Sequence, residues 1–129
     1  MAQPHKGDRR AYIVAIELAV RREIHSLATD SKLSVSQFVA NHLAMHAGLP
    51  EFVEQPSPRF RPTQFAPDVK TVTIRCHNDV RARVAMKAAH AGYHAPAPYV
   101  VDFVTQLAKN GGVATEIEYA YQEELLTSA

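Results

Sequence analysis

The chain has 129 residues, of which 47% are hydrophobic and 21% charged, and its formal net charge is +1. This composition suits one compact domain, or two very small ones that share a core, and excludes a disordered polymer. No apolar stretch approaches the roughly 18 residues of a membrane span, and the first ten residues lack the apolar region of a signal peptide. A single cysteine, Cys76, excludes an internal disulfide framework and a Cys-rich zinc site. We therefore expect a cytoplasmic protein that does not contact a membrane.

The small net charge hides an uneven distribution along the chain. Residues 70–112 carry six Lys or Arg against two Asp or Glu, whereas residues 113–129 carry four acidic side chains and no basic one. Residues 70–112 thus form a basic block, and residues 113–129 form an acidic tail that offsets its charge.

The first segment, residues 9–48, predicts a short strand followed by two helices. Ser34 with Gln37 three residues later fits a capping box, which predicts the start of the second helix, and Gly48 is suited to end it. One face of each helix carries an apolar stripe, formed by Val20, Ile24, Leu27 and Ala28 in the first and by Phe38, Val39 and Leu43 in the second.

The next segment, residues 49–69, holds five of the chain's eight prolines. Such a composition favours an extended connector over a third folded unit. Phe52, Phe60 and Phe65 indicate that the connector packs on the surface of the protein. At about 3 Å per residue, its length is enough to cross a small domain, so the segments on either side can pair within one chain.

The last folded segment, residues 70–112, repeats the pattern of the first. Polar and apolar residues alternate from Thr71 to Cys76, which predicts a strand with one buried face. Asn78 or Asp79 can cap the helix that follows, and Gly92 can end it. Pro98 is suited to the first turn of a further helix, which Gly111 and Gly112 stop. The acidic segment 113–129 predicts a C-terminal helix.

These two segments align as an internal repeat. With one residue inserted before the last helix, Phe38 matches Tyr99 and Leu43 matches Val104. Five earlier pairs share an offset of 60 residues: Val14 with Ile74, Ile16 with Cys76, Val20 with Val80, Ile24 with Val84 and Ala28 with Ala88. The sequence therefore predicts a mostly α fold with short β-strands, built from two tandem β-α-α units.

Each unit resembles the ribbon-helix-helix family of DNA-binding proteins. The resemblance rests on the strand ends, Val14-Ala15-Ile16 and Ile74-Arg75-Cys76, and on residues 33–39, which enter the last helix of the first unit. It implies that the two strands pair into an antiparallel ribbon over a helical core and that the ribbon lies in the DNA major groove. A tandem arrangement in one short chain is similar to relaxosome accessory proteins of the TraY type, from conjugative plasmids.

The resemblance also implies which residues contact DNA. Base-reading positions fall on Thr71, Thr73 and Arg75, although a solvated strand face also explains these residues. Phosphate contacts fall on the start of a helix and on nearby cations, namely Ser34, Val35 and Ser36 through their backbone N–H groups, and Lys70, Arg81 and Arg83. A solvated helix face explains the two arginines about as well.

The two units differ where DNA contact is expected. In the first unit the equivalent reading positions are apolar: Ala11, Ile13 and Ala15. They touch only thymine methyl groups, or another part of the protein covers them, such as the acidic tail. In the second unit Pro96 and Pro98 lack the N–H donors that a phosphate clamp requires. We therefore expect the second unit to read bases and the first unit to hold a phosphate, which predicts a non-palindromic DNA site.

Metal binding and catalysis find little support in the sequence. His42 and His46 stand four residues apart, on one helical face, but no third ligand with suitable spacing accompanies them. Cys76 and His77 are adjacent strand residues that point to opposite faces and cannot share a proton. Phosphate-loop and dinucleotide glycine patterns are absent from the sequence, which has only five glycines. We expect no enzyme activity and no cofactor.

The sequence thus predicts a protein that binds double-stranded DNA, as a transcriptional regulator or as a plasmid or phage DNA-processing accessory factor. The alternative is a protein-interaction scaffold, antitoxin-like or a phage adaptor, that has lost DNA binding. In that case the acidic tail is the candidate site for a protein partner. A monomer with an intramolecular pseudo-dimer and a homo-oligomer are both compatible with the connector length.

Overall fold

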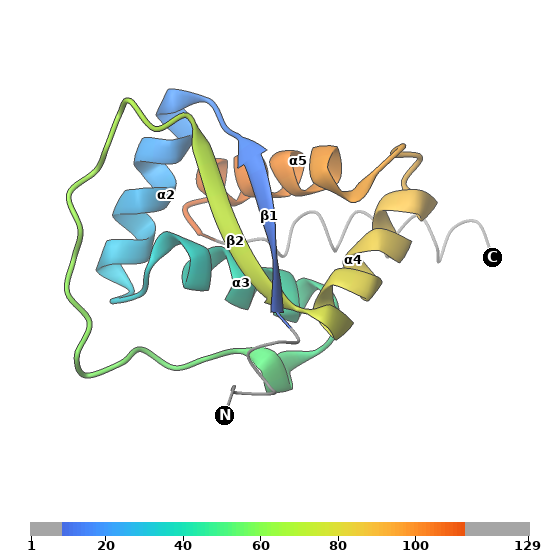
Figure 1. The fold of residues 1–129 in the computed structure, drawn as a ribbon, viewed down its shortest axis with the longest axis horizontal. Helices are drawn as coiled ribbons and strands as arrows, with labels where there is room; N and C mark the ends of the chain where they lie inside the picture. Colours follow the sequence, from blue (N-terminus) through green and yellow to red (C-terminus); the bar gives the residue numbers. More distant parts are fainter. Residues whose placement is uncertain (1–8, 113–129) are drawn as a thin grey trace.

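The computed structural model describes residues 9–112 and shows four helices with one two-stranded sheet. The elements in chain order are β1 (Arg9–Ala15), α2 (Leu18–Asp30), α3 (Val35–His46), the short 3-10 helix η1 (Pro50–Phe52), β2 (Thr71–His77), α4 (Asn78–His90) and α5 (Pro96–Lys109) (Figure 1). The mostly α class with short β-strands is therefore confirmed. The helix predicted for residues 113–129 lies outside the described residues.

The sheet forms within one chain, because β1 pairs with β2 in antiparallel fashion. Figure 1 shows the strands side by side in the middle of the fold, between α2 and α4. Tyr12 is opposite Ile74, and both side chains are buried. Successive strand residues point to opposite faces, so one face of the ribbon meets the core and the other faces away from it.

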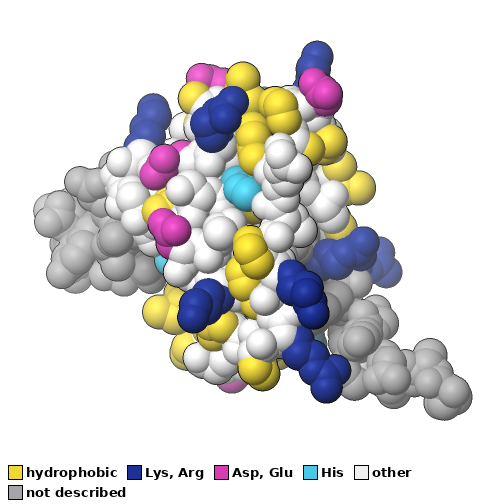
Figure 2. Space-filling view, turned by 90° about the vertical axis from the view of Figure 1, so that its left-hand side faces the viewer, with side chains coloured by type: hydrophobic (Ala, Val, Ile, Leu, Met, Phe, Trp, Pro, Cys, Tyr) yellow, Lys and Arg dark blue, Asp and Glu magenta, His cyan; other side chains and the backbone are white. Residues whose placement is uncertain are grey.

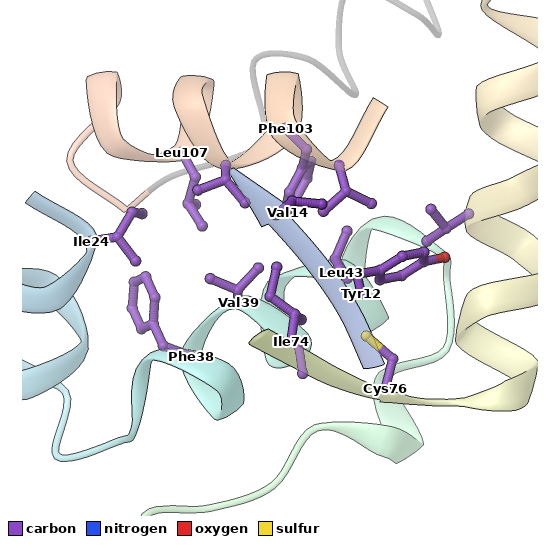
Figure 3. Packing of buried hydrophobic residues seen from close by; sticks show 14 of the residues in the cluster. Tyr12, Val14, Ile24, Phe38, Val39, Leu43, Ile74, Cys76, Phe103 and Leu107 are labelled. Carbon is purple, nitrogen blue, oxygen red and sulfur yellow. The ribbon is translucent and has the colours of Figure 1, made fainter. Parts of the chain in front are cut away.

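All four helices contribute to the core under the inner face of the ribbon. In Figure 3, Leu43 of α3 and Phe103 of α5 lie near the buried side chains of the strands, and Ile24 of α2 joins the same cluster beside Phe38. Val84 of α4 is also fully buried. Among the helices, α3 makes the most extensive contact with β2, while α5 contacts β1. The helices therefore support the ribbon from its inner side.

The predicted serine cap of α3 is confirmed, but the return bond of a full capping box is not formed, because the Gln37 side chain donates to Asn41 Oδ1 at 2.7 Å. Ser34 Oγ accepts a hydrogen bond of 3.1 Å from the backbone N–H of Gln37. For α4, the expectation of a cap at Asn78 or Asp79 was wrong. The cap is His77, whose Nδ1 accepts from the backbone N–H of Asp79 at 3.1 Å. Because β2 runs through His77 directly into α4, the capping position falls one residue earlier than the polar pair indicated.

Replacing Ser34 with Ala should lower the free energy of unfolding by about 1 kcal/mol, because the N–H of Gln37 loses its acceptor. Urea denaturation measures this change. Ser26→Ala is the matched control, since Ser26 is exposed in the middle of α2. A midpoint for Ser34→Ala equal to that of the control would show that the cap contributes nothing.

The connector contains no helix or strand between residues 53 and 70 and is anchored to α2. Arg21 is buried; its Nε donates to the carbonyl of Ile16 at 2.8 Å and its Nη1 to that of Val69 at 2.6 Å. Further along, the Arg22 guanidinium lies 4.9 Å from the ring centre of Phe65. Figure 2 shows this side of the molecule, where basic and hydrophobic side chains intermix. These contacts fix where β2 begins.

None of the described helices has the length and apolar character needed to cross a membrane.

Candidate nucleic-acid interface

The outer face of the ribbon consists of four cross-strand pairs. Three of them are Ala11 with Arg75, Ile13 with Thr73, and Ala15 with Thr71, and the fourth, Arg9 with His77, stands where β2 ends. The three β2 residues are exposed, and Ile13 retains 68% of its accessible surface. The structure thus places the three predicted base-reading residues together on one open face.

This face has the size and chemistry that major-groove recognition needs. A two-stranded ribbon fits a groove about 12 Å wide. The Arg guanidinium can donate two hydrogen bonds to guanine, and the Thr hydroxyl can donate or accept. All of these polar groups belong to β2, whereas their three β1 partners are apolar.

The start of α3 lies beside β2. Ser36 Oγ accepts a hydrogen bond of 2.9 Å from the backbone N–H of Arg75. One hollow is lined by Ser34, Ser36 and Gln37 of α3 together with Thr73 and Arg75 of β2. The first backbone N–H groups of a helix have no intrahelical acceptor and can bind a phosphate.

Two further predicted phosphate contacts adjoin the strand. Val35 is half-buried and lines a neighbouring hollow with Thr71 and Thr73. Lys70 is exposed immediately before β2, and its carbonyl accepts a hydrogen bond from the N–H of Ile16. Lys70 therefore stands at the Thr71 end of the ribbon.

The two arginines of α4 contact the protein itself. The Arg81 guanidinium lies 4.4 Å from the ring centre of Tyr12, which belongs to the inner face of the ribbon. Arg83 Nη1 donates to the carbonyl of Ala47, at the end of α3, at 3.2 Å. The structure thus separates both side chains from the outer face of the ribbon, and their phosphate role stays a prediction.

Two cations that the sequence analysis did not select lie near the start of α3. Lys32 and Arg59 are exposed and line a second hollow that includes Ser34 and Gln37. The sequence could have indicated Lys32, because it stands two residues before the capping serine. It could not have indicated Arg59, because only the path of the connector brings this residue to the start of α3.

The start of α5 lacks the donors that α3 provides. Its N-cap is Ala95, which makes no side-chain capping bond, and Pro96 occupies the first helical position. Pro98 follows in the first turn. Proline has no backbone N–H, so the start of α5 has fewer donors with which to bind an anion.

Histidines of α3 take part in packing. His46 is buried, its Nε2 lies 2.6 Å from the Tyr99 hydroxyl oxygen, and burial together with the nearby Lys87 charge lowers its pKa to about 4. The His42 ring meets the Phe38 ring edge-on, and burial lowers the pKa of His42 too. Within residues 9–112 no group of three or more His, Cys, Asp or Glu residues could hold a metal ion.

Comparison with known proteins yields no relative from which a role could be transferred. No protein family, curated protein or solved structure that was compared matches this chain. Function is therefore inferred from the chain's own residues and their arrangement.

Proposed function

We propose that this protein binds double-stranded DNA sequence-specifically by placing its two-stranded ribbon in the major groove. One observation carries the proposal: Thr71, Thr73 and Arg75 share the exposed face of a two-stranded ribbon. Their side chains then contact base edges, while the backbone at Ser34, Val35 and Ser36 and the Lys70 side chain hold phosphates. Lys32 and Arg59 extend the phosphate-binding surface.

We also propose that the fold consists of two tandem ribbon-helix-helix repeats, residues 9–48 and 70–112. Both α2 and α4 have 13 residues, and they begin 60 residues apart, at Leu18 and Asn78. Ile13 and Thr73 are also 60 residues apart, and they are paired in the ribbon. An internal two-fold axis through this pair would relate the two repeats, which supports the proposal.

A protein that binds DNA in this way would act as a transcriptional regulator or as an accessory factor in plasmid or phage DNA processing. A second candidate is a protein-interaction scaffold, which the apolar strip of Ala11, Ile13 and Ala15 favours. Ile13 is a large side chain at the centre of an open face, as in a surface that binds a protein. The two candidates differ in their response to DNA and to salt.

DNA affinity should fall steeply as the salt concentration rises, with a slope of log K against log salt of about −0.9 for each phosphate contact. Fluorescence anisotropy with a labelled duplex measures the slope. Lys70→Ala should reduce its magnitude by about 1. Lys109→Ala is the matched control, because it removes one positive charge at the last turn of α5. A scaffold would show no binding at moderate salt with any of these proteins.

A further inference from the structure

The outer face of the ribbon is divided lengthwise into two chemistries. In the pairs formed by Thr71, Thr73 and Arg75, the hydrogen-bonding side chains belong to β2 and their β1 partners are Ala or Ile. The one other pair on this face, Arg9 with His77, stands at the end of the ribbon. Ile13 lies at the centre of this face and is largely exposed. The internal two-fold axis proposed above, through Ile13 and Thr73, would exchange Arg75 with Ala15, so the side chains on this face do not follow that symmetry.

The two chemistries select different base edges. A guanidinium prefers guanine, which presents two acceptors in the major groove. An apolar side chain contacts the thymine methyl group favourably, but against a cytosine or guanine edge it would leave polar groups of the base without partners. The β1 side of the ribbon therefore favours thymine at the bases that it faces.

The surroundings of the two strands add to this difference. The start of α3, with its capping serine and its free backbone N–H groups, contacts β2 next to Arg75. The start of α5 is formed by Ala95 and Pro96. The polar side chains of the ribbon and the start of α3, which keeps its backbone N–H donors, thus lie together on the β2 side.

We propose that the DNA site is asymmetric and is read by one chain in one orientation. A guanine contacts Arg75 on the β2 side, and thymine methyl groups contact Ile13 on the β1 side. This inference rests on the proposed DNA binding and adds the class of site that is bound.

The test is selection from a random duplex library with the wild-type protein, followed by chemical replacement of single thymines in the selected site. Deoxyuridine keeps base pairing and removes only the methyl group. At the thymine facing Ile13, this replacement should weaken wild-type binding about fourfold, as expected for one buried methyl group. Ile13→Ala should bind both duplexes equally. Leu18→Ala, which shortens an exposed apolar side chain outside the ribbon, should keep the difference.

The outcomes separate this inference from the proposed function. Selection of a sequence without inverted symmetry, with a methyl effect that Ile13→Ala abolishes, supports both. Selection of an inverted repeat, or a site whose thymines all tolerate deoxyuridine, would overturn the inference and leave DNA binding intact. Failure to enrich any sequence at moderate salt would overturn the proposed function and the inference with it. Thermal melting of Ile13→Ala checks that the variant is folded.

Discussion

The free energy of unfolding should fall by about 3 kcal/mol as the pH is lowered from 6.5 to about 4, because of His46. In the folded protein His46 is 4% exposed. Its Nδ1 has no hydrogen-bond partner among the described residues. A proton added to the ring would therefore be buried, without a second acceptor and near the charge of Lys87.

The sign of this effect follows from which state binds the proton. Unfolding exposes His46, whose pKa returns from about 4 to 6.5, so between these values the unfolded chain binds more protons than the folded one. Stability therefore rises with pH across this window. The contribution is complete above pH 6.5 and is lost as the pH falls toward 4.

Urea denaturation at a series of pH values from 4 to 7.5 measures the effect. His46→Gln removes the titrating ring and keeps a polar group near the Tyr99 hydroxyl, so its stability should depend less steeply on pH. His90→Gln, which replaces an exposed histidine at the end of α4, is the control. Equal slopes for His46→Gln and wild type would show that His46 is not the group responsible.

Arg75→Ala should weaken binding to the selected DNA site by about 1–3 kcal/mol, or roughly 5- to 150-fold. The reason is that, in the proposed complex, Arg75 supplies the paired donors that recognise guanine. Removing the side chain leaves the backbone N–H of Arg75 bonded to Ser36 Oγ, so the ribbon keeps its place beside α3. Affinity for unrelated duplexes should change much less.

Competition binding on the selected and on a scrambled duplex measures this discrimination. Arg75→Lys is an informative second variant, because it keeps the charge and loses the planar pair of donors. We expect it to bind the selected site almost as weakly as Arg75→Ala does. If Lys restored binding, or if Arg75→Ala weakened both duplexes equally, Arg75 would be a phosphate contact instead of a base reader.

Local patterns predicted much of this fold because each depends on residues close in sequence. Ile24 and Val84 lie in stripes of helical period, and both are fully buried. The period of two in β2 fixes which side chains share a face, so the exposed row of Thr71, Thr73 and Arg75 followed from the sequence alone.

Features that depend on distant residues could not be predicted. Arg21 is buried because the carbonyl of Val69, 48 residues away, accepts its hydrogen bond. Arg81 lies over Tyr12 because α4 and β1 meet in space. Arg59 comes to the start of α3 through the path of the connector. The cap of α4 at His77 depended on where β2 ends, which is among the least certain features of any sequence pattern.

Binding-site selection at a fixed, moderate salt concentration, run in parallel with wild type and Arg75→Ala, tests the central claim most directly. We expect wild type to enrich one short sequence containing guanine, and Arg75→Ala to lose the preference for that base. Absence of any enriched sequence with the wild-type protein would contradict DNA reading by the ribbon. The exposed strip around Ile13 would then be assigned to a protein partner.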